Sequence, residues 1–148
     1  MKKVLALGVF ELIHVGHLEY LKFARSLGDC LIVAVTPDKE INGGNSLTQR
    51  GKGRPLFNQN DRMTMLRELR CVDYVFLHDG WEAAIRSVKP AVYVKGIEYQ
   101  GRLPEQDLVE SFGGVVRFHA GRVFSSTAII TGEMLRSKTK PNDLNLYP

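Results

Sequence analysis

Two histidines three residues apart carry the first chemical signal in this chain of 148 residues. The stretch HVGHLEYL places His14 and His17 around Gly16, where an apolar run gives way to a helical pattern. If a helix begins near Gly16, both imidazoles project to one side, beside backbone N–H groups that have no partner within the helix. The positive end of the helix dipole and the close backbone approach that Gly8 and Gly16 allow add to these donors, so the segment predicts an anion site.

Other interpretations of this segment stay open. A histidine pair at this spacing is also half of a metal site, for which Glu11 is the one further ligand nearby in the sequence. Either histidine is equally compatible with helix capping or packing. A strand, a glycine and a helix also open dinucleotide-binding folds, but GVFELIHVG lacks the GxGxxG spacing and the P-loop pattern is absent from the sequence.

The segments that must position the histidines alternate between two patterns. Short, nearly continuous apolar runs are typical of strands covered on both faces, and they are VLALGVF, CLIVAV, DYVFL, AVYVKG and VVRF. Helical spacing lies between and after them, over residues 17–27, 58–70, 81–88, 104–112 and about 126–137. This alternation predicts an α/β fold, a Rossmann-like doubly wound parallel sheet of about five strands with helices on both faces.

In such sheets ligands bind outside the carboxyl ends of the strands, at the point where the strand order reverses. The first strand ends where GVFELIHVGH begins, so the topology points to the same segment as the histidines. The long irregular stretch NGGNSLTQRGKGRP is rich in glycine and basic residues, and loops of this length in compact domains are usually functional. We expect it to cover a phosphate.

Composition narrows the classes of partner. The net charge of +4 and the pI near 9.2 fit an anionic ligand. The basic residues are scattered without a nucleic-acid motif, and no apolar run is long enough to span a bilayer, so we expect no nucleic acid and no membrane as partner. Cys30 and Cys71 lack any paired spacing, and the start of the chain does not resemble a signal peptide, so we expect free thiols and a cytoplasmic protein.

The stretch GVFELIHVGHLEYL resembles the GxFDxxHxGHxxxL signature of the nucleotidyltransferases of the cytidylyltransferase-like superfamily. The later segments RPLFNQNDRM, KPAVYVKGIEY and GGVVRFHAGRVFSSTAII are similar, in order and nearly in spacing, to the adenylyltransferases that make ADP-heptose. The resemblance extends to about Leu135, and we expect a nucleotidyltransferase domain over residues 1–137 with a tail at 138–148.

The resemblance implies roles for individual residues. His14, His17 and Lys52 would stabilise the charge that builds on the α-phosphoryl group during transfer. The remaining nucleotide contacts would come from the first strand exit, the VKG segment and the SSTxI motif, namely Gly8, Val9, Phe10, Gly16, Lys95, Gly96, Ser125, Ser126 and Thr127. Glu11 and Arg62 would face the substrate that accepts the nucleotide, and Glu11 replaces the aspartate of the signature. From the residues alone, Ser and Thr at a helix start are ordinary caps, and Lys52 and Arg62 are compatible with solvated surface charges.

The implied reaction is transfer of AMP from ATP to a sugar 1-phosphate by in-line attack on the α-phosphorus, with release of pyrophosphate. Mg²⁺ would arrive with the nucleotide, so no dedicated metal ligands are expected. Two alternatives remain: a cytidylyltransferase that uses CTP and glycerol 3-phosphate, and a nucleotide-sensing domain without turnover. Relatives of this kind are often dimers, so we expect a homodimer.

Overall fold

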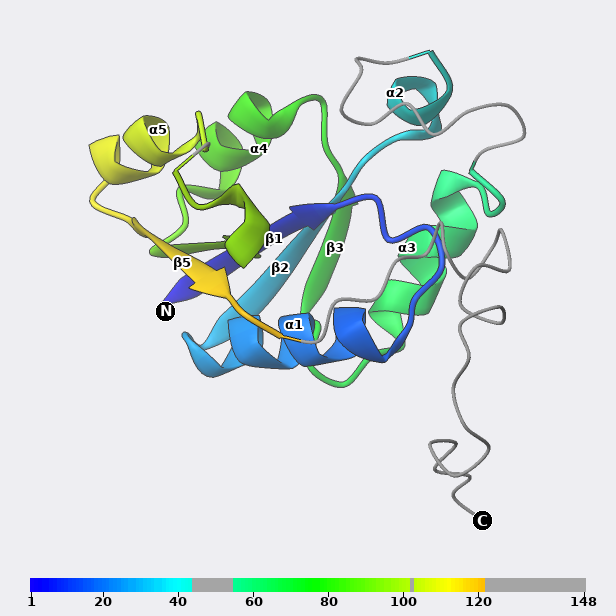
Figure 1. Cartoon of the computed structure of the whole chain (residues 1–148), viewed down its shortest axis with the longest axis horizontal. Helices are drawn as coiled ribbons and strands as arrows, with labels where there is room; N and C mark the ends of the chain where they lie inside the picture. Colours follow the sequence, from blue (N-terminus) through cyan, green and yellow to red (C-terminus); the bar gives the residue numbers. More distant parts are fainter. Residues whose placement is uncertain (44–54, 102, 122–148) are drawn as a thin grey trace.

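The computed structural model describes residues 1–43, 55–101 and 103–121, and it places five parallel strands in one sheet (Figure 1). The strand order is β3-β2-β1-β4-β5, and all four pairings between neighbours are parallel. The strands are β1 (Lys3–Gly8), β2 (Cys30–Val35), β3 (Tyr74–Leu77), β4 (Val92–Gly96) and β5 (Val115–His119). The predicted doubly wound parallel sheet is therefore confirmed.

Helices cover both faces of this sheet (Figure 1). The helical elements are α1 (Val15–Ser26), α2 (Asp38–Gly43), α3 (Gln59–Arg67), α4 (Trp81–Val88), the 3-10 turn η1 (Ile97–Tyr99) and α5 (Gln106–Ser111). Helices α1 and α3 lie on one face, and α4 and α5 lie on the other. Because successive side chains of a strand point to opposite faces, each central strand feeds both cores. In β1, Val4 and Ala6 pack on the α1 side, whereas Leu5 packs on the α4 side.

Most helices lie close to their predicted positions. Helix α4 has the predicted bounds. Helix α3 begins one residue after its predicted start, because the Asn58 side chain caps it by accepting a hydrogen bond from the N–H of Asp61 at 2.9 Å. Helix α1 begins two residues earlier than expected, at Val15. The short elements α2 and η1 were not predicted. The expected last helix and the tail lie outside the described residues.

The chain adds strands on both sides of β1, so the strand order reverses there. This position is the switch point of the sheet. The first crossovers add β2 and β3 on one side of β1, and the later ones add β4 and β5 on the other side. The carboxyl ends of β1 and β4 are therefore adjacent at one edge of the sheet. The segment from Gly8 to His14 leaves β1 at this edge, where ligands bind in folds of this type.

Cys30 and Cys71 are both free thiols, as the sequence indicated. Within the described ranges, no helix combines the length and the apolar character needed to cross a membrane.

Candidate functional site

His14 and His17 cap the first turn of α1 reciprocally. His14 is the N-cap residue, and its Nδ1 accepts hydrogen bonds from the backbone N–H of Gly16 at 3.1 Å and of His17 at 3.4 Å. The Nδ1 of His17 accepts in return from the backbone N–H of His14 at 3.3 Å. This is the geometry of a capping box with imidazoles in place of the usual hydroxyl and carboxylate. The capping role is thus present, and it decides how the rings are oriented.

The capping bonds fix which nitrogen of each ring carries the proton. An Nδ1 that accepts a backbone hydrogen bond has no proton of its own, so the neutral ring is protonated at Nε2. Burial lowers the pKa of His14, which favours this neutral form near pH 7. The two rings stack with their centroids 3.9 Å apart and 22° between their planes. The neutral rings therefore keep Nε2–H as their donor, and both rings belong to residues at the start of α1.

Phe10 supports this arrangement from the exit of β1. Its backbone adopts a left-handed conformation with φ of 50°, which is uncommon for a residue other than glycine, and its side chain is buried. The Phe10 ring lies 5.4 Å from the His17 ring, centroid to centroid, and also covers Gly8. A side chain at Gly8 would begin 3.0 Å from the Phe10 ring, so glycine leaves room for this packing. Strained residues of this kind are found at functional sites.

Arg62 is a buried hub rather than a surface charge, because its side chain is fully buried. Its Nη1 donates to the carbonyls of Val9 at 2.7 Å and Thr36 at 2.8 Å, and its Nε donates to the carbonyl of Phe57 at 3.1 Å. Its Nη2 forms an ion pair with Asp38 at 2.7 Å. The guanidinium thus ties the exits of β1 and β2 to the start of α3. The alternative of a solvated Arg62 is wrong.

Glu11 is also buried, with 3% of its surface exposed. Its Oε1 accepts a hydrogen bond from the backbone N–H of Leu56 at 3.2 Å. This bond connects the β1 exit to the segment that leads into α3. Glu11 therefore lies beside the predicted site.

Lys95 and Gly96 end β4, directly across the switch point from β1. The Lys95 ammonium lies 4.7 Å from the centre of the Tyr99 ring and 5.9 Å from that of Tyr93. Burial lowers the pKa of Lys95, and the carboxylates of Glu105 and Glu98 act against this shift. The cation is thus partly desolvated and held between aromatic faces, where its field is stronger than at an open surface.

Two further residues at this edge carry no sequence signal that we recognised. His78 follows β3, is buried, and lies with Nε2 at 3.1 Å from the Thr36 hydroxyl, while its Nδ1 accepts from the N–H of Gly80 at 3.0 Å. Tyr20, on α1, donates its hydroxyl to the Val94 carbonyl at 2.6 Å. His78 comes directly after an apolar run. This position alone could have indicated that it lies at the carboxyl ends of the strands, where ligands bind.

Four predicted site residues, Lys52, Ser125, Ser126 and Thr127, lie outside the described residues. The structure brings the other predicted residues to one edge of the sheet, at the ends of β1 and β4, at the start of α1 and on α3. Among the described residues, no group of three or more histidine, cysteine, aspartate or glutamate side chains is placed to hold a metal ion.

Comparison with known proteins assigns the chain to a family. The cytidylyltransferase-like family pattern matches residues 5–132. The chain is 41% identical over 133 residues to the bifunctional protein HldE of Streptomyces coelicolor, covering 86% of this chain and 27% of the relative. It is 38% identical over 145 residues to the HldE of Geobacter metallireducens, covering 92% of this chain and again 27% of the relative. The chain therefore spans about a quarter of the length of these relatives.

Solved structures agree with the family assignment. The lipopolysaccharide core biosynthesis protein of Thermoplasma volcanium superposes with a TM-score of 0.65 and 32% identity, over 82% of this chain and 99% of that one. The pantoate-beta-alanine ligase of Francisella tularensis, with a TM-score of 0.58 and 16% identity over 88% of this chain and 65% of that one, shares the fold. From the family match and these relatives, we conclude that the chain belongs to the cytidylyltransferase-like family.

Proposed function

We propose that this protein transfers AMP from ATP to a sugar 1-phosphate, with heptose 1-phosphate as the type of acceptor, and releases pyrophosphate. The observation that carries this proposal is the stacked pair of His14 and His17, whose Nε2–H donors lie beside the start of α1. Donors in this position suit the oxygens of a phosphate chain, because the helix start adds unsatisfied N–H groups and partial positive charge. The sugar acceptor is supported by the likeness to the lipopolysaccharide core biosynthesis protein.

In the proposed reaction an oxygen of the sugar phosphate attacks the α-phosphorus of ATP in line with the leaving pyrophosphate. A new phosphorus–oxygen bond forms as the bond to pyrophosphate breaks, and no covalent intermediate with the protein is needed. The attacking oxygen is already ionised near neutral pH, so the protein needs no general base. Its contribution is to position two polyanions and to stabilise the charge that develops on the transferred group.

Individual residues have separate parts in this proposal. His14 and His17 would donate from Nε2 to oxygens of the α-phosphoryl group and the leaving group, and their capping bonds hold them in place beforehand. Lys95 would add positive charge from the β4 side of the switch point. Lys52 remains a predicted donor, and Ser125, Ser126 and Thr127 remain predicted contacts of the outer phosphates. Arg62 and Glu11 would position the acceptor indirectly, because they fix the segment that leads from β1 to His14.

Mg²⁺ is expected to enter with the triphosphate, held by phosphate oxygens and water. When bound, it would neutralise part of the charge on the phosphates. The described residues at the site offer imidazole and ammonium groups to these phosphates, which complements a metal held on their other oxygens. A homodimer and a cytoplasmic location remain predictions.

The test is a pyrophosphate-release assay with ATP or CTP, each paired with heptose 1-phosphate or glycerol 3-phosphate. We expect the highest kcat/KM for ATP with heptose 1-phosphate. Highest turnover with CTP and glycerol 3-phosphate would replace the proposal by the cytidylyltransferase alternative. Nucleotide binding in calorimetry, combined with no pyrophosphate release from any pairing, would instead indicate a nucleotide-sensing domain.

A further inference from the structure

Glu105 is a buried carboxylate that makes few of the contacts a buried charge needs. Only 6% of its surface is exposed, and although it is the N-cap residue of α5, its side chain does not cap the helix. Its Oε1 lies 3.5 Å from the Tyr93 hydroxyl, at the limit of a hydrogen bond, and its Oε2 has no hydrogen-bond partner in the described part of the chain. Burying an ion is costly unless an opposite charge compensates it, so Glu105 points to a nearby cation.

Lys95 is the cation that the fold places beside this carboxylate. Tyr93 and Lys95 are two residues apart on β4, so their side chains project to the same face of the sheet. The Lys95 ammonium lies 5.9 Å from the centre of the Tyr93 ring, and the hydroxyl of that ring donates to Glu105. One tyrosine thus lies beside both charges. The Glu105 carboxylate also acts against the lowering of the Lys95 pKa that burial causes.

Several elements bring titratable groups close to Lys95 or to the end of its strand. They are Glu105 before α5, Glu98 and Tyr99 on η1, His78 after β3, and Tyr20 on α1. Glu98 is the second carboxylate among them, but it is exposed and lies against Gly96, where water weakens its field. The field of Glu105 acts through the protein interior, where the same charge has a stronger effect.

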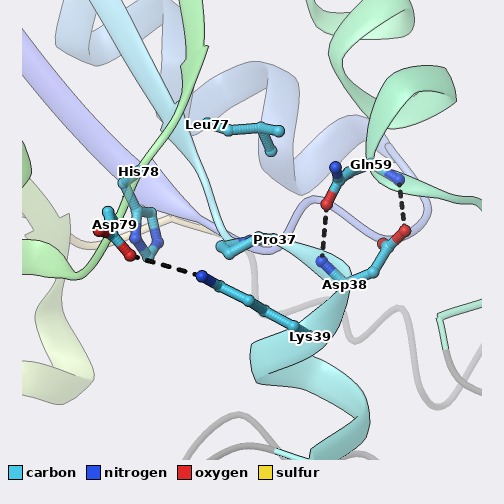
Figure 2. Close-up of a pocket in the computed structure, with 7 residues that line it drawn as sticks. All are labelled: Pro37, Asp38, Lys39, Gln59, Leu77, His78 and Asp79. Carbon is cyan, nitrogen blue, oxygen red and sulfur yellow. Dashed lines mark hydrogen bonds and ion pairs between the residues drawn. The ribbon is translucent and has the colours of Figure 1, made fainter.

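On the β3 side of the lysine, the described carboxylates already have partners. His78 lines a cavity of about 590 Å³ beside α2, which the exits of β2 and β3 and the start of α3 enclose (Figure 2). In the same lining, Asp79 pairs with Lys39 at 3.5 Å, and Asp38 pairs with Arg62 at 2.7 Å. Among the described residues of this lining, no carboxylate is left to compensate the ammonium at the end of β4.

We propose that Glu105 is a positioning residue of the nucleotide site, whose buried carboxylate is the counter-charge that holds the Lys95 ammonium at the end of β4. The inference rests on the proposed function, in which Lys95 adds positive charge at the nucleotide phosphates. Glu105 acts through Lys95 rather than on the ligand, because its own oxygens are buried. It keeps a partly desolvated cation ionised, so that the site meets the phosphates with its full charge.

The first measurement follows the ionisation of Lys95 itself. NMR of the lysine side chains, with the Lys95 signal assigned by its loss in Lys95→Met, gives the titration midpoint of Lys95. Glu105→Gln keeps the shape of the side chain but removes its charge, so the midpoint should fall by about one pH unit. Glu105→Asp keeps the charge and should return the midpoint most of the way to that of wild type.

The matched control is Glu110→Gln, which removes an exposed carboxylate from the same helix. Glu110 accepts a hydrogen bond from Gln106 at 2.8 Å and lies toward the other end of α5. Its loss should leave the Lys95 midpoint within about 0.2 pH units of wild type, because water and salt screen exposed charges.

The second measurement asks whether this charge serves the nucleotide. Calorimetry gives the Kd for ATP at a pH where Lys95 is charged in both proteins and at the midpoint of Lys95 in wild type. Between these two pH values the Kd should rise about threefold more in Glu105→Gln than in wild type, because a smaller fraction of Lys95 remains charged. A purely structural role of Glu105 would not change this pH dependence.

The outcomes separate this inference from the proposed function. Equal Lys95 midpoints in wild type and Glu105→Gln, or an equal fall in Glu110→Gln, would overturn the role of Glu105 while nucleotidyl transfer stands. A lower midpoint without any change in the pH dependence of ATP binding would overturn it as well. Absence of both ATP binding and pyrophosphate release in wild type would overturn the proposed function and the inference with it.

A double variant keeps the inference testable if Glu105→Gln is poorly folded. Removing both charges together, in Lys95→Met combined with Glu105→Gln, leaves no buried ion without its partner. The melting temperature of the double variant should therefore exceed that of Glu105→Gln. A double variant that melts below both single variants would overturn the pairing of the two charges.

Discussion

The rings of His14 and His17 stack at 3.9 Å, and each Nδ1 accepts the backbone N–H of the other residue. The two residues therefore restrict one another: neither ring can turn without breaking the hydrogen bond that it accepts from the backbone N–H of the other residue. Preorganised donors of this kind stabilise developing charge without reorganisation during the reaction. The capping and phosphate-binding interpretations, which the sequence left as alternatives, are compatible because they use different nitrogens of the same rings.

The first prediction concerns the tautomers of these rings. At pH 7.5, long-range proton–nitrogen NMR should show His14 and His17 protonated at Nε2, with Nδ1 unprotonated. His14 should titrate below its ordinary pKa of 6.5, because burial disfavours the charged ring. A proton on Nδ1 of either ring at pH 7.5 would contradict the capping geometry.

Two substitutions at His17 should separate its capping role from its proposed role in transfer. His17→Ala removes the Nε2–H donor and the cap, so we expect kcat to fall roughly 10²–10³-fold and stability to fall by about 1 kcal/mol. His17→Glu restores a residue that suits the third position of a capping box, so stability should recover. Activity should fall further, because a carboxylate repels phosphate. Activity of His17→Ala within about threefold of wild type would leave His17 with capping alone.

Lys95 offers a test of the β4 side of the switch point. Lys95→Met keeps a long apolar side chain against Tyr93 and Tyr99 but removes the charge, so the KM for ATP should rise about tenfold, as for a lost charge-assisted hydrogen bond. Lys89→Met is the matched control, since Lys89 also lies over an aromatic ring, that of Phe112 at 5.5 Å, but before β4 begins. Equal KM values in the two variants would remove Lys95 from the proposed site.

The sequence predicted the sheet and the histidine segment because both depend on local pattern. Apolar runs fix the strands, and the spacing of His14 and His17 fixes their common side once a helix follows. Arg62 could be placed near the site only by resemblance, and its burial was not predictable. Three of its partners are the backbone carbonyls of Val9, Thr36 and Phe57. Every residue has such a carbonyl, so the sequence does not indicate which ones Arg62 contacts.

The parts that the sequence missed are short or depend on contacts across the sheet. Helix α2 has six residues and ends in Asn42 and Gly43, so its composition favours a loop. His78 owes its place to the hydroxyl of Thr36, a residue 42 positions earlier that the sheet brings beside it. The cavity beside α2 likewise forms from three separate segments. Such contacts depend on strand order, which periodicity alone does not give.

The hub at Arg62 leads to a prediction on stability. Arg62→Lys cannot reproduce a planar fork that bonds to three carbonyls and to Asp38, so it leaves buried acceptors unsatisfied. We expect the free energy of unfolding to fall by about 3 kcal/mol, because buried carbonyls are left without a donor. Urea denaturation measures this, with the exposed Arg67→Lys on the same helix as the control. A loss below about 1 kcal/mol, similar to the control, would contradict the role of Arg62 in holding the exits of β1 and β2 to the start of α3.

His78 should make the protein less stable in mild acid. Burial, and to a smaller extent the nearby Lys95, lower the pKa of His78 to about 4, and Asp79 acts in the opposite direction. The unfolded chain, with an ordinary pKa of 6.5, then binds the proton more readily than the folded protein between pH 4 and 6.5. This contribution to stability is complete above pH 6.5 and is lost as the pH falls toward 4. Between pH 7.5 and pH 5 it amounts to about 2 kcal/mol.

The test of this contribution is urea denaturation at pH 7.5 and pH 5 for wild type and for His78→Gln. Glutamine retains a polar side chain that can bond to Thr36 but has no proton to gain in this range. The decrease in the free energy of unfolding between the two pH values should therefore be about 2 kcal/mol smaller in the variant. The difference between the two proteins isolates His78, because every other titrating group is common to both. Equal pH dependence in wild type and variant would show that His78 titrates normally in the folded protein, and that its burial does not hold it neutral.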